Sequence, residues 1–224
     1  MREKLTHAVE DYLKTIYQIQ SEEGRATTKE IADRLEVTPA SVTGMLKKLA
    51  ATKPPLVFYR KHQGVMLSPE GEQVALEILR HHRLLEQFLH QILGYEWEDV
   101  HDEADRLEHV ISEEFEERIA EAMGNPSHDP HGDPIPTREL QILDSPQTPL
   151  SDLRKGSWAV IHRVQDRDPE LLKYLSEIGM IPGAHLVVLE YSPFDQNLRL
   201  QVEGQAEQVI LGPQVTRQIF VEPG

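Results

Sequence analysis

Residues 100–117, VHDEADRLEHVISEEFEE, bring imidazole and carboxylate groups close together along the chain. Asp105, Glu108 and His109 follow one another at helical spacing, and His101 stands one turn earlier. On a single helix these four side chains form one stripe. Imidazole nitrogens and carboxylate oxygens are ligands of divalent metal ions, so the stripe predicts a metal site. The alternative, and the more common meaning of such a triplet, is a solvated helix face with surface ion pairs.

Two other segments carry groups of the same kind. His82 and Glu86 lie four residues apart in a segment whose apolar periodicity predicts a long helix over about 69–93. Asp11 lies in an N-terminal segment, 5–20, that has the same periodicity. Three helices with ligand groups beside their apolar residues favour a shared metal site over solvation. The chain has no cysteine, so oxygen and nitrogen atoms must hold any metal ion.

The charge of the chain is unevenly distributed. The formal net charge is −15, and residues 66–124 hold 4 basic against 16 acidic residues. Residues 25–65, in contrast, hold 8 basic against 3 acidic residues. A local basic patch can bind DNA phosphates even on an acidic protein. The acidic segment would repel itself unless cations bind there.

The basic segment has the pattern of a winged helix-turn-helix. A short helix follows Gly24, a second begins at Thr38 with Pro39 in its first turn, and residues 54–71 alternate as a hairpin does. In this fold the second helix presents its N-terminal residues to base edges, while basic side chains contact phosphates. The alternative is a compact helical pair with no DNA-binding role. We expect the DNA-binding residues to be Thr38, Pro39, Ala40, Ser41, Thr43, Lys47, Lys48, Arg60 and Lys61.

The rest of the chain predicts a helical segment followed by a β domain. A further helix is expected over about 100–124, and the proline-rich segment 124–150 is expected to be a linker or an ordered irregular segment. Short β-rich runs separated by Gly, Pro and Asn then predict a small barrel. The charged N-terminus lacks the apolar stretch of a signal peptide, and no run is long enough for a membrane helix. We therefore expect a cytoplasmic protein.

Together, these features resemble the diphtheria toxin repressor family of metal-dependent transcriptional regulators. The resemblance runs nearly end to end and includes YLKTIYQI, HHRLLEQFL, VHDEADRLEH and HGDPIP. It implies a mainly α fold with a β domain. Its parts would be a winged helix-turn-helix (1–74), a metal-binding and dimerisation domain (75–145) and an SH3-like, FeoA-like β-barrel (146–224). The implied partners are palindromic double-stranded operator DNA and a second copy of the chain, with neither a membrane nor a small organic substrate.

The resemblance also implies two sets of metal ligands. The primary site would consist of Asp11, Asp105, Glu108 and His109. The ancillary site would consist of His82, Glu86 and His101, completed from the barrel by Asp168 or Glu170. Leu171 stands where the family has an amide ligand, and Lys14 stands where the small manganese-type members have a glutamate.

The ligand types favour one metal over another. Iron-type members have a methionine and a cysteine where this chain has Asp11 and Asp105. Hard oxygen donors suit Mn²⁺, so we expect Mn²⁺ as the cofactor, with Fe²⁺ as the second choice. The expected function is a manganese-dependent repressor of metal-homeostasis genes, with the metal as co-repressor, and not an enzyme. The alternatives are an iron(II)-dependent regulator, a dimetal carboxylate enzyme and a metal buffer.

One loop remains outside these sets. Residues 127–136, SHDPHGDPIP, offer His128, Asp129, His131 and Asp133 within six residues. They form either a separate metal site or a fixed loop shaped by its prolines.

Overall fold

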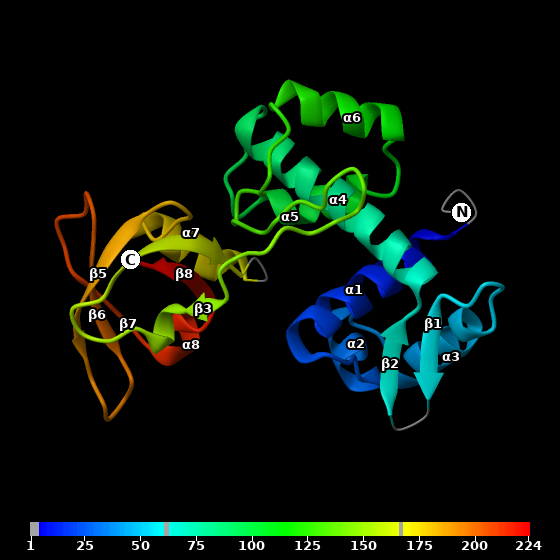
Figure 1. The fold of residues 1–224 in the computed structure, drawn as a ribbon, viewed down its shortest axis with the longest axis horizontal. Coiled ribbons are helices and arrows are strands. Elements are labelled where there is room, and N and C mark those ends of the chain that lie inside the picture. Colours follow the sequence, from blue (N-terminus) through cyan, green and yellow to red (C-terminus); the bar gives the residue numbers. More distant parts are fainter. Residues whose placement is uncertain (1–4, 61–62, 166–167) are drawn as a thin grey trace. The chain divides into compact units, whose positions relative to one another are not determined.

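The computed structural model describes residues 5–60, 63–165 and 168–224 (Figure 1). The chain forms two compact units, and each is built from several segments. Unit 1 comprises Met1–His82, Glu108–Ile111 and Pro136–Gln141. Unit 2 comprises Arg83–Leu107, Ser112–Ile135 and Ile142–Gly224. Within the described residues, no helix is both long and apolar enough to cross a membrane.

Unit 1 begins with three helices, which confirms the helical N-terminal region: α1 (His7–Glu23), α2 (Thr28–Arg34) and α3 (Pro39–Ala50). Helix α1 ends at Gly24, whose φ of 78° is left-handed and lets its N–H donate to the Gln20 carbonyl. Helix α2 begins with a capping box between Thr27 and Glu30. These local signals explain where the helices start and stop.

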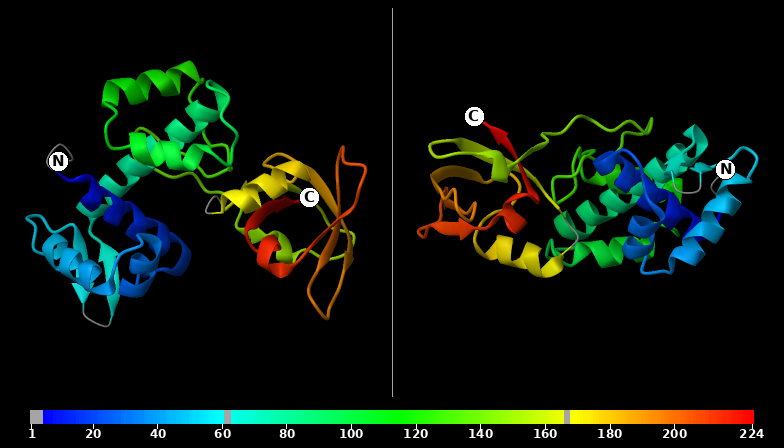
Figure 2. Two further views of the ribbon diagram at one scale, coloured as in Figure 1. Left: turned by 180° about the vertical axis from the view of Figure 1, so that it is seen from behind. Right: turned by 90° about the horizontal axis from the view of Figure 1, so that it is seen from below.

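A hairpin completes the winged helix-turn-helix: β1 (Val57–Arg60) and β2 (Gly64–Leu67). The strands are antiparallel, with Phe58 opposite Met66. Strand β1 packs on α3 and β2 packs on α1 (Figure 2). The core between them is apolar and closed, with Leu13, Ile16 and Leu46 at 0% exposure. The hairpin therefore shares one core with the helix that carries Asp11.

Three further helices follow: α4 (Pro69–Gln91), α5 (Val100–Leu107) and α6 (Glu113–Ala122). The prediction of one helix over about 100–124 was wrong, because the chain leaves the helix after Leu107 and starts a new one at Glu113. Ser112 has an extended backbone and accepts a hydrogen bond from the Phe115 N–H, so it caps α6 rather than continuing α5. Glu108 and His109 therefore lie in a turn.

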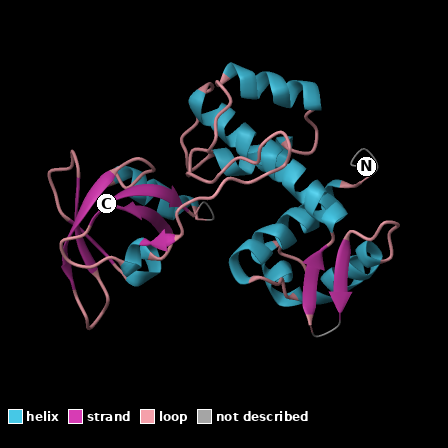
Figure 3. Cartoon of the chain, viewed as in Figure 1, coloured by secondary structure: helices cyan, strands magenta, loops and turns pink. Residues whose placement is uncertain are grey.

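The C-terminal part of unit 2 is an antiparallel sheet in the order β3-β8-β4-β5-β6-β7 (Figure 3). Its strands are β3 (Thr148–Pro149), β4 (Trp158–Val164), β5 (His185–Tyr191), β6 (Leu198–Val202), β7 (Val209–Leu211) and β8 (Ile219–Pro223). Short helical pieces connect them: η2 (Leu150–Asp152), α7 (Pro169–Glu177) and α8 (Pro213–Thr216). The predicted β runs are confirmed. Among the described residues, however, no pairing joins β7 to β3, so the expected barrel is an open sheet.

The proline-rich segment before the sheet is irregular but held in place. Gly132 has a φ of 88°, and a Cβ there would collide with the His162 carbonyl of β4. Two backbone contacts add to this: a bridge between His128 and Pro134, and a hydrogen bond from the Val164 N–H to the His131 carbonyl. Of the two alternatives for this segment, the ordered irregular one is correct for residues 127–135.

Candidate metal centre

Unit 1 brings together three of the predicted primary-site residues. Asp11 comes from α1, whereas Glu108 and His109 come from the turn after α5. The Nε2 atom of His109 lies 2.8 Å from Oδ1 of Asp11 and 3.4 Å from Oε1 of Glu108. One ligand atom from each residue falls within 4.8 Å of the other two. Glu108 and His109 thus reach Asp11 from a turn, whereas the sequence predicted that they would lie on one continuous helix.

The Glu108 carboxylate is fully buried and is neutralised from within the chain. The Lys14 ammonium donates to both carboxylate oxygens, at 2.7 and 2.8 Å. His82 Nδ1 lies 2.6 Å from Oε2 of the same carboxylate. A buried carboxylate without such partners is strongly disfavoured. Lys14 thus places a positive charge directly on a predicted metal ligand.

Glu10, which no sequence pattern pointed to, is buried and contacts the other ring nitrogen of His109. The Oε2 atom of Glu10 lies 2.7 Å from Nδ1 of His109. A carboxylate on one imidazole nitrogen fixes the ring and leaves the other nitrogen for a metal ion. The only sequence signal was its position directly before Asp11, on a helix face about 100° away.

His109 has an elevated pKa because its carboxylate neighbours outweigh its burial. Burial by itself lowers the pKa of this imidazole, whereas Asp11, Glu108 and Glu10 all raise it. Without a metal ion, the two ring nitrogens face carboxylates, which favours the imidazolium form. Metal binding at Nε2 therefore requires His109 to lose a proton.

Of the remaining predicted helix ligands, Asp105, His101 and Glu86 belong to unit 2. Asp105 is an exposed residue of α5, and its Oδ2 atom is 3.8 Å from Nε2 of His101. His101 Nδ1 lies 3.1 Å from Oε1 of Glu86, a fully buried residue of α4. Within unit 2, the structure therefore brings together Glu86 and His101. His82 contacts Glu108 in unit 1, as described above.

Asp168 and Glu170 were predicted to supply a ligand from the β domain. Both are exposed, and Asp168 is the N-cap of α7, where its Oδ1 atom accepts from the Glu170 and Leu171 N–H groups. Across the part of the chain that is described, neither residue belongs to a group of three potential ligands. Their ligand role stays a prediction, and the geometry gives Asp168 a capping role.

Most of the predicted DNA-binding residues lie at the start of α3 or along it, and Arg60 is the last residue of β1. Thr38, which caps α3 by accepting from the Ser41 N–H, is exposed, while Val42 and Leu46 are fully buried. Thr43 is half-buried and donates its hydroxyl hydrogen to the Pro39 carbonyl, so towards a base it can act only as an acceptor. Lys61 lies outside the described residues. The exposed residues of the set are Thr38, Pro39, Ala40, Ser41, Lys47, Lys48 and Arg60.

The four polar residues of the loop 127–136 do not converge on one point. Asp133 pairs with Arg83 at 3.0 Å, and His128 packs edge-on against His162. Burial lowers the pKa of His128. The other two, Asp129 and His131, are buried beside Glu86. No sequence pattern connected Glu86 to this loop.

Comparison with known proteins covers nearly the whole chain. Residues 4–65 match the domain described as "Iron dependent repressor, N-terminal DNA binding domain". Residues 68–137 match "Iron dependent repressor, metal binding and dimerisation domain", and residues 148–223 match the FeoA domain. The matched domains imply operator DNA and a second copy of the chain as partners.

Individual relatives agree with these domain matches. The iron-dependent repressor IdeR of Mycobacterium leprae (strain TN) is 32% identical over 97% of this chain and 98% of its own length. The HTH-type transcriptional regulator MntR of Bacillus pumilus (strain SAFR-032) is 37% identical over 53% of this chain and 80% of its own. A manganese-dependent transcriptional repressor solved in complex with manganese is 36% identical. It covers 95% of this chain and 98% of its own, with a TM-score of 0.88. The chain therefore belongs to the iron-dependent, or diphtheria toxin, repressor family, whose members are metal-dependent, DNA-binding transcriptional repressors and not enzymes.

Proposed function

We propose that this protein is a manganese(II)-responsive repressor of metal-homeostasis genes, with the metal as co-repressor. It would bind a palindromic operator as a homodimer. The single observation that carries the proposal is that the helix bearing Asp11 packs within the winged helix-turn-helix, while Asp11 itself contacts His109 at 2.8 Å. We also propose three domains: a DNA-binding domain (1–74), a metal-binding and dimerisation domain (75–145) and a β domain (146–224). The proposed metal ligands are Asp11, Asp105, Glu108 and His109, with His82, Glu86 and His101.

The donor atoms fit a hard or borderline divalent cation. Asp11, Glu108 and His109 offer two carboxylates and one imidazole, and the chain has no cysteine. Oxygen and imidazole donors suit Mn²⁺ and Fe²⁺, while thiolates select softer ions. The manganese-bound structure and the MntR relative support Mn²⁺. The IdeR relative keeps Fe²⁺ as the second candidate.

The chain's own residues prepare this site and connect it to DNA binding. Glu10 orients His109, while Lys14 and His82 hold the Glu108 carboxylate. A bound divalent cation would supply the positive charge that keeps the carboxylates of α1 and of the turn at 108–109 together. Since α1 packs on α2 and β2, its position bears on the helices that present α3 to DNA. A ligand that favours one position of α1 shifts the population towards it.

The test is fluorescence anisotropy with labelled DNA from upstream of the protein's own gene and of adjacent metal-transporter genes. The protein is titrated at fixed salt in chelator, in Mn²⁺ and in anaerobic Fe²⁺. We expect Mn²⁺ to raise operator affinity by roughly 5- to 150-fold, the usual range for allosteric coupling. A response to Fe²⁺ alone would replace manganese by iron in the proposal.

Asp11→Ala tests the bridging role of α1. This variant should lose most of the Mn²⁺ response, because α1 then contributes no ligand. Asp102→Ala is the matched control, since Asp102 is an exposed carboxylate of α5 that belongs to no proposed ligand set. Equal Mn²⁺ dependence in Asp11→Ala and in the unmodified protein would refute the bridging role.

A further inference from the structure

Unit 2 contains a group of potential ligands that only partly overlaps the predicted sets. Glu86 comes from α4, while Asp129 and His131 come from the loop 127–136. Glu86 and His131 are 0% exposed and Asp129 is 5% exposed. One ligand atom from each lies within 4.8 Å of the other two. Two carboxylates and an imidazole thus lie together in the buried interior of unit 2.

The hydrogen bonding of His131 determines which of its ring nitrogens faces the two carboxylates. Nε2 lies 2.8 Å from the carbonyl oxygen of Trp97, and a carbonyl only accepts, so Nε2 carries the hydrogen. Nδ1 then points to the carboxylates, at 3.9 Å from Oε2 of Glu86 and 4.0 Å from Oδ1 of Asp129. An imidazole that donates one N–H to a carbonyl and turns its other nitrogen to carboxylates has the arrangement of a metal-ligating histidine.

The distances also bear on a shared cation. Separations of 3.9 and 4.0 Å are too long for hydrogen bonds. Ligands about 2.1 Å from an octahedral ion lie about 3.0 Å apart when adjacent and about 4.2 Å apart when opposite. Both separations are close to the value for opposite ligands, and one ligand has only one opposite, so at least one carboxylate would have to move about 1 Å closer to the imidazole to share such an ion.

Asp129 supplies an independent observation. Its Oδ1 atom accepts from the backbone N–H groups of His131 and Asp133, each at 2.9 Å, which holds the carboxylate in one orientation. Its Oδ2 atom is buried and accepts no hydrogen bond. Arg83 forms a longer ion pair with this atom, with its Nε atom 3.7 Å from Oδ2. An oriented, buried carboxylate oxygen without a donor is an available ligand.

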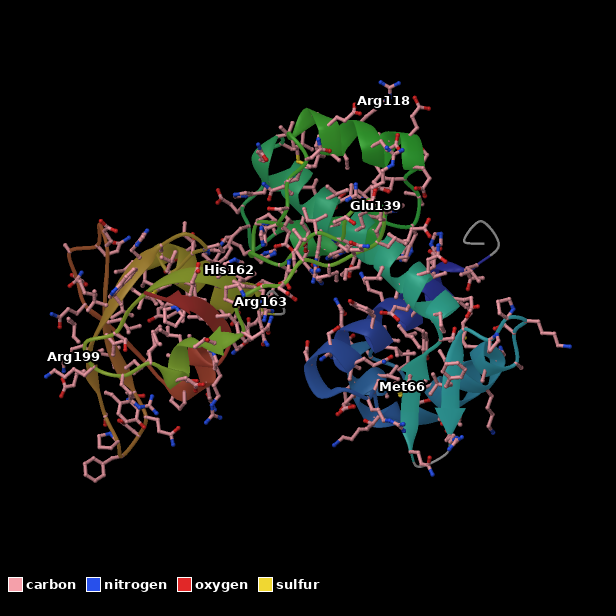
Figure 4. The ribbon with its side chains drawn as sticks, in the orientation of Figure 1. Met66, Arg118, Glu139, His162, Arg163 and Arg199 are labelled. Carbon is pink, nitrogen blue, oxygen red and sulfur yellow. The ribbon has the colours of Figure 1, made fainter. Side chains whose placement is uncertain are left out.

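Two arginines lie near this group of ligands. Arg83 donates to Asp133 at 3.0 Å, and Arg163 approaches the same Asp133 oxygen at 3.6 Å. Arg163 lies next to His162 on β4 (Figure 4). Both guanidinium groups approach Asp133, and Arg83 also lies 3.7 Å from Asp129, so one arginine is shared between two carboxylates, while Glu86 lies beside Asp129. Burial, then Asp133 and Glu86, raise the pKa of Asp129 well above its usual value. A divalent cation bound between Glu86 and Asp129 would neutralise both carboxylates.

We propose that Glu86, Asp129 and His131 form an additional buried site for a divalent cation such as Mn²⁺. Glu86 would connect it to the predicted ancillary ligands, because its Oε1 atom lies 3.1 Å from His101 Nδ1 while Oε2 faces His131. One carboxylate would thus serve two neighbouring cations through different oxygens. The site itself does not depend on DNA binding, and only the link through His101 relies on the proposed function.

The test counts bound Mn²⁺ per chain. Full-length protein is stripped with chelator, equilibrated with Mn²⁺ by dialysis and analysed for metal, while electron paramagnetic resonance measures the free ion. Asp129→Asn keeps the size of the side chain and the acceptor for the two backbone N–H groups. His131→Phe keeps a planar ring and removes the nitrogen ligand. His128→Gln is the matched control, because His128 belongs to the same loop but not to the group.

We expect Asp129→Asn and His131→Phe to bind about one equivalent of Mn²⁺ fewer than the unmodified protein, and His128→Gln to bind the full amount. Circular dichroism checks that each variant is folded. If Asp129→Asn folds and binds the same number of ions with the same affinity, a proton occupies the group and the proposal is wrong. Operator binding measured in parallel separates the two proposals, since the Mn²⁺ count decides this one whatever the anisotropy shows.

Discussion

Glu108 and Glu86 are both completely buried carboxylates, yet the chain surrounds them differently. Glu108 meets the Lys14 ammonium and the His82 imidazole at hydrogen-bond distance. Glu86 meets the imidazole of His101 on one oxygen, and on the other faces His131 in a group that contains a second carboxylate, Asp129. Burial and residue types are therefore not enough to say how a cluster responds to a metal ion. The internal cation lies close to the carboxylate at Glu108, where Lys14 is 2.7 Å away, and farther at Asp129, where Arg83 is 3.7 Å away.

The two clusters should respond differently when a metal ion arrives. At Glu108 an incoming cation competes with Lys14, so part of the metal-binding free energy is used to displace an existing ion pair. At Asp129 an incoming cation meets only the longer contact to Arg83, at 3.7 Å. Lys14 should therefore set a threshold concentration for the primary site, whereas the second cluster has no ammonium group among its described contacts.

The largest effect should come from Glu108→Gln. This change leaves the Lys14 ammonium buried without its carboxylate, and breaking a buried ion pair typically costs about 3–5 kcal/mol. Urea unfolding in chelator should show this loss of stability, and Mn²⁺ binding at the primary site should disappear.

Glu114→Gln is the control for that measurement. Glu114 and Arg118 form an exposed i,i+4 pair on α6, and Arg118 projects outward (Figure 4). Exposed pairs contribute about 0–1 kcal/mol, so this variant should unfold nearly as the unmodified protein does. Equal stability losses in Glu108→Gln and Glu114→Gln would contradict the importance given to the Lys14 ion pair.

The next effect should come from Glu10→Gln. The variant weakens the hydrogen bond that orients His109, and loss of a carboxylate behind a ligating histidine usually lowers metal affinity about 10- to 100-fold. Isothermal titration calorimetry with Mn²⁺ measures it. Metal affinity equal to that of the unmodified protein would show that Glu10 has no orienting role.

Lys14→Met should act in opposite directions with and without metal. In chelator the variant should be less stable, because Glu108 loses its main cationic partner. In Mn²⁺ the competitor is gone, so affinity should rise by about tenfold, which corresponds to about 1.4 kcal/mol. Thermal unfolding should therefore show a wider gap between chelator and Mn²⁺ than in the unmodified protein. A narrower gap would mean that Lys14 assists metal binding.

The smallest effect on stability should come from Asp129→Asn in chelator. Because its pKa is raised above the usual 3.8, folded Asp129 keeps a proton that the unfolded chain has lost. The stability of the unmodified protein should therefore fall as the pH rises from about 3.8 through the folded pKa. The asparagine variant lacks this pH dependence and should be at least as stable as the unmodified protein at neutral pH, because it has no carboxyl group to ionise. A loss as large as that of Glu108→Gln would erase the difference between the clusters.

Local signals were enough to predict much of the fold. Thr38 as a cap and Pro39 behind it marked the start of α3, and the alternating runs marked the strands of the β domain. Caps, prolines and periodicity act between residues that are near in sequence, so they can be recognised without knowledge of the tertiary structure. The missed break between α5 and α6 shows the limit, since Ser112 is a cap inside a stretch that otherwise has helical spacing.

The sequence by itself determined that ligand groups of the right chemistry lie on separate segments, that sulfur is absent and that a basic winged helix-turn-helix is present. Only the tertiary structure decided which groups meet. Lys14 and Glu108 are 94 positions apart, and Glu10 and His109 are 99 apart. The meeting of His131 with Glu86 likewise depends on how the loop packs in unit 2. Such pairings follow from packing and from the need to neutralise buried charge, which no local pattern encodes.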